Sequence, residues 1–424
     1  MQTGVIKIII FFRVTLYSII RNIVPEAESM YMEETVYLFN PENDMALANF
    51  TPYYKVPAEI RQMAADLSVL PAWYASAGSV VKLPSAERMP RWEELCNGRM
   101  SFPEVRTTAM YPSLPWSPWG WSPALVHTLR QAGVSDEVLP SAETLQTIRL
   151  LSSRTSSVAV LRQVATGKGV CGEVAVCHTL EEVKNRLDAW GRCVLKAPWS
   201  GSGRGLAFVT PDTWTASLEG WAARMLRTQG AMMAEPIYNK VCDFAMEFHA
   251  DEWGSVTFAG YSLFETDAFG NYKGNLLASD AEIERRLGAY VPCGMLHEIR
   301  YRLLEVLHGW LRVGYTGYLG VDMMVCQENG YVVHPCVEIN LRMNMGVLSR
   351  LFFDRYAHPS ARGRFVIEHY PASGEAMDFH SRMREEHPVL LQEERMMTGY
   401  VSLTPVNEDT RYQAYVLFEA NFIG

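Results

Sequence analysis

One stretch of the sequence runs Tyr331-Val332-Val333-His334-Pro335-Cys336-Val337-Glu338-Ile339-Asn340-Leu341-Arg342-Met343-Asn344. It begins as an apolar, β-branched run, and its polar residues Glu338, Asn340 and Arg342 then alternate with apolar ones, so in an extended chain they share one face. A carboxylate and an amide two residues apart supply the hard oxygen ligands that suit Mg²⁺, and the arginine adds a planar cation. Taken alone, the pattern favours a half-solvated edge strand, so a metal site depends on the rest of the chain.

Length and composition limit the classes of protein to consider. The chain has 424 residues, more than one core usually holds, so two or three domains are expected. The formal net charge of −9 argues against a nucleic-acid-binding surface. Eight cysteines without a Cys-x-x-Cys pair indicate free thiols rather than a zinc site, and therefore a reducing, cytoplasmic location.

Residues 1–29 differ from the rest of the sequence. Their apolar run, Val5–Ile20, is interrupted by Lys7 and Arg13 and is shorter than the roughly 20 apolar residues of a spanning helix. No small-residue cleavage site follows it. We expect an extension that is disordered or arises from a misassigned start, in preference to a membrane anchor.

The next part, residues 30–140, is predicted to be a small α/β domain. Thr35–Phe39 is predicted to be a strand, followed by the polar segment Asn40–Asp44. Loops that leave the carboxyl ends of strands often bind ligands; a turn with Asp44 capping a helix from Met45 explains the segment equally well. The three tryptophans of Pro115–Trp121 could line a ligand, but packing on their own domain is favoured.

A glycine-rich hairpin follows in the middle of the chain. Cys193–Ala197 is predicted to be a strand, Pro198–Leu206 a loop with three glycines, and Ala207–Thr210 a second strand. No helix follows directly, which disfavours a Walker loop or a dinucleotide fingerprint. Such a hairpin can offer backbone N–H groups to phosphates, with Lys196 as a point charge. The alternative, a flexible surface hairpin with a solvated lysine, is less favoured.

The strand Ala231–Ile237 ends in a carboxylate followed by a proline, Glu235-Pro236. Proline removes a donor and leaves carbonyl groups free, so this segment could bind the edge of an adenine. The next predicted strand, Val241–His249, carries Asp243 and Glu247 on one face.

The strand Tyr318–Cys326 contains one carboxylate, Asp322, which needs a partner or a metal. A two-residue turn at Asn329-Gly330 would place Asp322 and Glu338 on opposite faces. We therefore predict a three-residue loop, Glu328-Asn329-Gly330, with Gly330 in a left-handed conformation, or equally a bulge at Pro335. Either would put both carboxylates on one face.

With these features in this order, the chain resembles the ATP-grasp superfamily, the fold of biotin carboxylase and D-alanine–D-alanine ligase, over roughly Ser141–Arg350. The resemblance implies a phosphate-binding lysine and its covering loop at Lys196, Ser202, Gly203 and Gly205. It implies an adenine- and ribose-binding segment at Glu235, Pro236 and Ile237, with Asp243 and Lys240 near the ribose and phosphates. It implies magnesium ligands at Asp322, Glu338 and Asn340, and an arginine for an acyl phosphate at Arg342.

The resemblance also implies the overall organisation. The fold class is α/β (α+β): an ATP-grasp domain over 141–350, completed by 351–424, behind an N-terminal Rossmann-like pre-ATP-grasp domain. The family's second ATP-binding lysine has three candidate counterparts here, Arg154, Arg162 and Lys168.

The implied activity is that of an ADP-forming ligase that uses ATP and Mg²⁺ (or Mn²⁺). It would activate a small carboxylate, an amino acid or peptide in most of the family, and join it to an amine or a thiol. A kinase that stops after phosphorylating its substrate and a non-catalytic nucleotide-binding protein are the alternatives. Neither a nucleic acid nor a membrane is expected as a partner.

Overall fold

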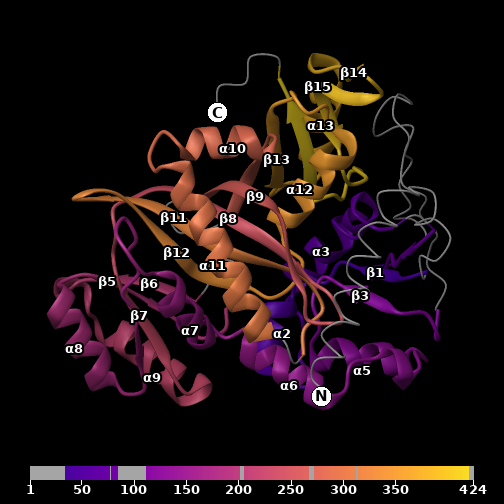
Figure 1. Ribbon diagram of the computed structural model, residues 1–424. Coiled ribbons are helices and arrows are strands. Elements are labelled where there is room, and N and C mark those ends of the chain that lie inside the picture. The colour runs from indigo at the N-terminus through magenta and orange to yellow at the C-terminus, as the bar shows by residue number, and fades with distance from the viewer. Residues whose placement is uncertain are drawn as a thin grey trace, which may run out of the picture.

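The computed structural model describes residues 34–76, 78–84, 111–200, 205–266, 272–311 and 314–419. Three sheets lie within these residues, and Figure 1 shows them as three parts of one molecule. The predictions for residues 1–29, Ser202 and Gly203 fall outside the described residues.

The N-terminal part is a three-stranded parallel sheet in the order β2-β1-β3. A parallel sheet flanked by helices is typical of α/β folds, which agrees with the Rossmann-like domain predicted for this region. Its strands are β1 (Val36–Leu38), β2 (Val80–Val81) and β3 (Trp116–Pro118). Its helices are α2 (Asn43–Asn49), α3 (Ala58–Asp66), η2 (Leu70–Trp73), α5 (Pro123–Gln131) and η4 (Asp136–Val138).

The tryptophan-rich segment follows the favoured interpretation in part: Trp116 packs in the core of this part, whereas Trp119 joins a core shared with C-terminal residues such as Val347 and Phe352. Trp116 and Trp119 are buried, and the Trp119 ring lies edge-on to Phe39 at 4.9 Å between centroids. The prediction that Asp44 caps a helix is wrong. Helix α2 begins at Asn43 with Glu42 at its N-cap, so Asp44 lies in the first turn, where its side chain is free to point elsewhere.

Two helices, α6 (Ala142–Leu151) and α7 (Arg154–Val164), lead to an antiparallel four-stranded sheet in the order β4-β7-β5-β6. The expected strand, glycine-rich loop and strand are present as the pair β5–β6. Helices α8 and α9 pack on this sheet, and each ends at a glycine with positive φ, Gly191 and Gly230. The elements are β4 (Ala175–Cys177), α8 (Leu180–Trp190), β5 (Cys193–Lys196), β6 (Leu206–Val209), η5 (Pro211–Thr213), α9 (Ala216–Gln229) and β7 (Met232–Pro236).

The largest sheet has nine strands in the order β12-β11-β8-β9-β10-β13-β16-β15-β14. Its first five strands, together with α10 and α11, enclose one large apolar core that α7 also joins, and Figure 1 shows α11 crossing in front of these strands. The elements are β8 (Lys240–Ala250), β9 (Val256–Thr266), β10 (Tyr272–Leu277), α10 (Asp280–Leu287), α11 (Cys293–Leu311), β11 (Gly317–Glu328) and β12 (Gly330–Asn340).

The C-terminal residues continue this sheet. Strand β13 pairs with β10, and β16 and β15 follow as an antiparallel pair. Helix α12 covers the sheet between its two halves. These elements are α12 (Met345–Tyr356), β13 (Gly363–His369), α13 (Glu375–Glu386), β14 (Leu390–Gln392), β15 (Arg395–Ser402) and β16 (Tyr412–Phe418).

The β11–β12 hairpin has the offset predicted for a shared carboxylate face. Gln327 pairs with Tyr331, so three residues form the loop, and Gly330 has φ +118°. The register then shifts once more beyond Met324, which pairs with His334, so that Asp322 pairs directly with Glu338. Residues that pair across antiparallel strands lie on the same face. The predicted common face is therefore confirmed.

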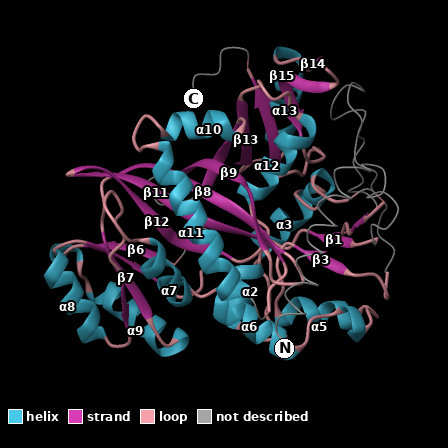
Figure 2. Cartoon of the chain, viewed as in Figure 1, coloured by secondary structure: helices cyan, strands magenta, loops and turns pink. Residues whose placement is uncertain are grey.

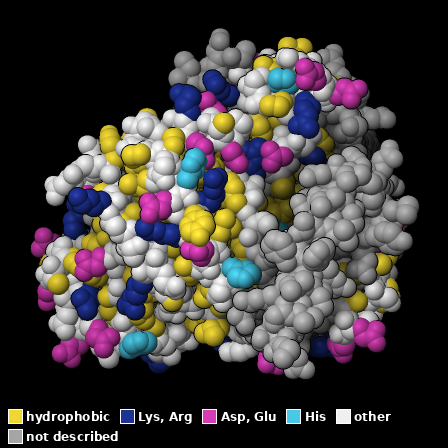
Figure 3. Space-filling model, viewed as in Figure 1, with side chains coloured by type: hydrophobic (Ala, Val, Ile, Leu, Met, Phe, Trp, Pro, Cys, Tyr) yellow, Lys and Arg dark blue, Asp and Glu magenta, His cyan; other side chains and the backbone are white. Residues whose placement is uncertain are grey.

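The elements are distributed as Figure 2 shows, with helices on the outside of all three sheets. On the face drawn in Figure 3, acidic and basic side chains are interspersed among apolar ones, in keeping with the mixed-charge composition. Within the described residues, the longest apolar helices fall short of what crossing a bilayer requires.

Candidate functional site

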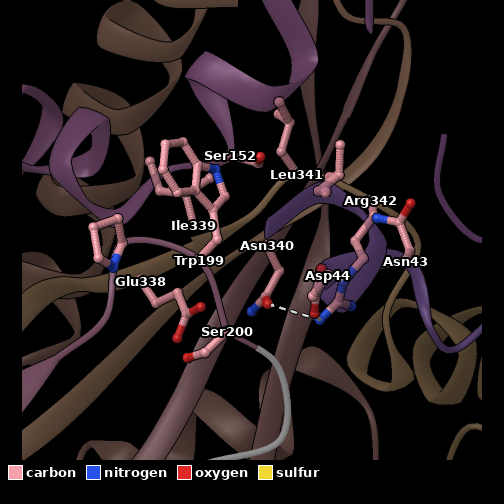
Figure 4. Close-up of a pocket in the computed structure, with 12 residues that line it drawn as sticks. Asn43, Asp44, Ser152, Trp199, Ser200, Glu338, Ile339, Asn340, Leu341 and Arg342 are labelled. Atoms are coloured by element: carbon pink, nitrogen blue, oxygen red, sulfur yellow. Dashed lines mark hydrogen bonds and ion pairs between the residues drawn. The ribbon is translucent and has the colours of Figure 1, made fainter. Parts of the chain in front are cut away.

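A polar pocket lies where the N-terminal part meets the end of strand β12 (Figure 4). Its lining combines the start of helix α2, the beginning of the glycine-rich loop and the polar end of β12. The lining residues are Asn43, Asp44, Leu47, Ser152, Pro198, Trp199, Ser200, Glu338, Ile339, Asn340, Leu341 and Arg342.

Arg342 is fixed by a carboxylate from the N-terminal part. Its Nε donates to Asp44 Oδ1 at 2.8 Å and its Nη2 to Asp44 Oδ2 at 2.6 Å, a bidentate pair. The same Nη2 donates to Asn340 Oδ1 at 3.2 Å, as the dashed line in Figure 4 shows. Burial would lower the pKa of Arg342, but Asp44 and the other nearby carboxylates raise it above its ordinary value. The guanidinium therefore stays charged and held in one orientation.

Glu338 faces a second arginine. Arg154, at the start of α7 and only 5% exposed, places Nη2 2.8 Å from Glu338 Oε1. Its Nη1 donates to Ala197 O at 2.7 Å and to Ser200 Oγ at 2.6 Å. One side chain thus joins β12 to the glycine-rich loop.

Of the three candidates for the second ATP-binding cation, the structure brings one to the site. Arg154 lies there, whereas Arg162 and Lys168 are exposed, at the far end of α7 and in the turn after it. Arg154 reaches the site because Ser153 caps the helix and starts it directly beside Pro198, whose carbonyl accepts from the Arg154 N–H at 2.9 Å.

Asp322 and Asn340 lie beside Glu338, and we call these three side chains the oxygen cluster. Asn340 Nδ2 donates to Asp322 Oδ2 at 2.9 Å. Desolvation raises the pKa of Asp322 to about 7, and the Glu338 carboxylate adds to this, while the Asn340 hydrogen bond and the Arg342 charge oppose it. A carboxyl whose proton affinity is raised by a neighbouring carboxylate is typical of a site that holds a cation.

The donor set fits Mg²⁺. The two carboxylates and the amide oxygen come from neighbouring strands and offer the hard oxygen ligands that this ion prefers. Among the described residues, no group of three or more His, Cys, Asp or Glu side chains is placed to hold a metal. The site relies instead on two acids and an asparagine.

Lys196 and Glu235 form a buried ion pair in the four-stranded sheet. Lys196 Nζ donates to Glu235 Oε2 at 2.6 Å, and both side chains are less than a tenth exposed. Burial raises the pKa of the Cys336 thiol on β12, the charges of Glu235, Asp322 and Glu338 raise it further, and that of Lys196 opposes them.

The two ends of the glycine-rich loop approach closely. The Ala197 N–H donates to Gly205 O at 2.9 Å. A Cβ on Gly205 would lie 2.2 Å from Ser200 Oγ, the oxygen that Arg154 holds. Only glycine fits there, which supports its expected place in the loop; Ser202 and Gly203 lie outside the described residues.

Asp243 lies on the same sheet face, paired across the strands with Met324. Its Oδ2 accepts from Lys240 Nζ at 2.5 Å and from Thr266 Oγ1 at 2.9 Å. Strand β7, which belongs to the four-stranded sheet, ends at Pro236, and the chain continues from the predicted adenine segment Glu235–Ile237 into β8.

Sequence reasoning placed Glu247 on one face with Asp243 but gave it no role; the structure shows it as a buried carboxyl on the same sheet face as Asp322. Burial raises the pKa of Glu247 to about 8, and a hydrogen bond from Asn344 Nδ2 at 3.0 Å opposes this. Two glycines make room for it: a Cβ on Gly320 would lie 2.5 Å from one carboxyl oxygen and a Cβ on Gly346 2.1 Å from the other. The available signal was its position between the apolar residues Met246 and Phe248.

Known proteins are similar to this chain in structure. Neither a family model nor a curated protein sequence matches it. Biotin carboxylase from Campylobacter jejuni has a TM-score of 0.50 at 12% identity, over 92% of this chain and 88% of that one. N5-carboxyaminoimidazole synthetase from Staphylococcus aureus, solved with ADP, has 0.46 at 12% identity over 92% and 95%. L-amino acid ligase from Bacillus licheniformis has 0.44 at 12% over 92% and 94%.

Proposed function

We propose that this chain, which has the ATP-grasp fold, is an ATP- and Mg²⁺-dependent ligase. It would activate a small carboxylate as an acyl phosphate, join it to an amine, and release ADP and phosphate. The observation that carries the proposal is the row Glu338, Asn340 and Arg342 at the pocket, with Asp322 across the hairpin and Lys196 on the facing sheet.

The roles follow from the chemistry of each group. Asp322, Glu338 and Asn340 would hold Mg²⁺, which when bound neutralises charge on the phosphates. Lys196 and Arg154 would contact the phosphates from the four-stranded sheet and from α7, in the way that paired cations stabilise a transferring phosphoryl group. When the nucleotide binds, the ion pair between Glu235 and Lys196 would weaken, and Glu235 would accept a hydrogen bond from a ribose hydroxyl or from the adenine edge.

Arg342 would bind the substrate carboxylate. A carboxylate oxygen attacks the γ-phosphorus, the bond to the ADP oxygen breaks, and an acyl phosphate forms. The amine then attacks the acyl carbon, and inorganic phosphate leaves. Asp44 would keep the guanidinium oriented through both steps, because a bidentate pair fixes its plane.

The glycine-rich loop would exclude water from the acyl phosphate, which would otherwise hydrolyse. Arg154 supports this role, since it binds Ser200 at the beginning of the loop and Glu338 at the metal ligands. The pocket beside Trp199 and Asp44 would take the small acid, with an amino acid or peptide as the expected class.

Phosphate release measured with Mg-ATP and pairs of amino acids tests the proposal. A ligase forms ADP only when both the acid and the nucleophile are present, whereas a kinase needs one substrate. Glu338→Gln is the matched inactive variant, because glutamine keeps a partner for the buried Arg154 while it weakens the metal site. Equal phosphate release from the wild type and this variant would contradict the proposal.

A further inference from the structure

His334 lies on the face of the hairpin that carries the oxygen cluster. It pairs with Met324, and Asp322 pairs with Glu338. Asp322 and Met324 lie two residues apart on β11, whose pairing with β8 is regular there, so the two pairs belong to one face of the sheet. His334 therefore lies farther along the same surface, on the side of the metal ligands away from Arg342.

The imidazole of His334 has unsatisfied hydrogen-bonding capacity. Its exposed fraction is 0%, and within the part of the chain that the structure describes neither Nδ1 nor Nε2 has a hydrogen-bond partner. Burial, together with the positive charge of Lys196, lowers the pKa of His334 to about 3. The ring is therefore neutral, with one N–H to donate and one nitrogen to accept. A buried polar atom left unpaired destabilises the fold, so the fold alone does not explain this arrangement.

An aromatic wall faces this ring. The Tyr238 ring lies edge-on to His334 with 5.7 Å between centroids. Its hydroxyl accepts from the N–H groups of Gly172 at 3.3 Å and Glu173 at 2.8 Å, which fixes it in place. Tyr238 follows the predicted adenine segment Glu235–Ile237 by one residue.

Gly172 completes the enclosure. It has φ +130°, and a Cβ there would lie 3.3 Å from the Cε1 and Nε2 atoms of His334. Only a glycine brings backbone this close to the ring at that φ. The backbone on either side is tied to β12, since the Cys171 N–H donates to Val333 O and the Val333 N–H to Gly169 O, both at 2.9 Å.

We propose that His334 recognises the nucleobase of the bound nucleotide, with one ring nitrogen hydrogen-bonded to the base edge and Tyr238 against the base. The inference rests on the proposed function, because it assumes that a nucleoside triphosphate binds with its base beside the segment Glu235–Ile237. A flat heterocycle with adjacent donor and acceptor atoms can hydrogen-bond to a neutral imidazole and pack against the neighbouring aromatic ring. His334 is then the residue that makes nucleotide affinity depend on the base.

Calorimetric binding of two probes, Mg-ATP and Mg-tripolyphosphate, tests the assignment. His334→Leu should weaken ATP binding about 10-fold, the effect of losing one buried hydrogen bond to the ligand, and leave tripolyphosphate binding unchanged. His334→Gln keeps a donor and an acceptor and should lose less than His334→Leu. Thermal unfolding gives an independent readout. His334→Leu removes two unpaired polar atoms, so its melting temperature should equal or exceed that of the wild type.

Three results would overturn the inference. In the first, His334→Leu binds ATP as the wild type does. In the second, the affinities of the variant for ATP and for tripolyphosphate fall equally, or its melting temperature falls while its affinity for ATP is unchanged. The latter result is expected if His334 only binds a buried water molecule. In the third, the wild type binds neither probe, which would also contradict the proposed function; the first two results leave that function intact.

Discussion

Arg154 is a single residue on which three parts of the site depend. It contacts Glu338 on β12, Ser200 in the glycine-rich loop and the Ala197 carbonyl that precedes it. These contacts explain why an arginine serves here: its planar fork satisfies several acceptors in one plane, which the single ammonium of a lysine cannot do.

Arg154→Met should therefore weaken both nucleotide binding and the fold. We expect at least a 10-fold loss of Mg-ATP affinity and a loss of about 2 kcal/mol in unfolding free energy, because Glu338 is left without its partner. Calorimetry and urea denaturation measure the two effects. Arg162→Met is the matched control on the exposed side of the same helix. Similar results for both variants would show that Arg154 has no special role.

We predict that Asp322 makes cation binding depend on pH. Its pKa of about 7 means that below pH 7 a bound cation must displace a proton. The affinity for Mn²⁺, followed by electron paramagnetic resonance without nucleotide, should fall up to about tenfold per pH unit below 7 and level off above it. Asp322→Asn should bind Mn²⁺ more weakly with little pH dependence between 6 and 8. A wild-type affinity that does not change over this range would contradict the assignment.

Three secondary-structure elements enclose the Glu247 side chain. Strand β8 carries the carboxyl, while β11 and α12 each present a glycine to it. Its folded-state pKa of about 8 lies above the ordinary 4.5. The protonated carboxyl therefore stabilises the fold fully below pH 4.5, and this contribution is lost as the pH rises to about 8.

Glu247→Gln removes this titration and keeps the shape of the side chain. The unfolding free energy of the wild type should fall relative to the variant by about 1 kcal/mol per pH unit between pH 5 and 8. Chemical denaturation of both proteins across this range measures the difference. The titration of Asp322 is common to the two proteins and cancels in the comparison. Parallel pH profiles would show that Glu247 is already ionised in the folded protein.

Some secondary-structure elements could be predicted from the sequence, and others could not. Strands β5, β11 and β12 were predicted because apolar runs and alternation are local properties of the sequence. Helix α12 was missed, since residues on most of its circumference, from Gly346 to Phe353, are buried and no polar face marks its period. The register shift at Pro335 was anticipated only as one of two alternatives, and the structure contains both the three-residue loop and the shift.

Across the whole molecule, the ion pair of Asp44 and Arg342 joins the N-terminal sheet to the nine-stranded sheet. The two residues are 298 positions apart in the chain. A second link lies close by, where the Met343 N–H donates to Trp119 O at 3.0 Å. The N-terminal part thus contributes to the pocket by positioning the arginine. The substrate-loop interpretation placed the segment Asn40–Asp44 at a site but did not foresee that Asp44 would pair with Arg342.

Asp44→Asn should lower turnover more than nucleotide binding. It leaves Arg342 charged but without a bidentate carboxylate, so the guanidinium is misplaced, and we expect kcat to fall about 10²-fold. The KM for ATP should stay within about twofold, because the nucleotide is held by other residues. Asp136→Asn, which breaks the exposed pair with Arg130 in the same part of the chain, is the control and should change neither. A rise in the KM for ATP without a change in kcat would place Asp44 elsewhere in the mechanism.

Sequence alone identified the lysine strand with its glycine hairpin and the row Glu338, Asn340 and Arg342, because strand alternation and turn chemistry are properties of neighbouring residues. Tertiary structure alone decided which side chains meet. It chose Arg154 from three candidates, paired Lys196 with Glu235, and left His334 buried without a partner. These outcomes depend on contacts between residues far apart in the chain. Packing and strand register set the geometry of such contacts, and no periodic pattern in the sequence reveals it.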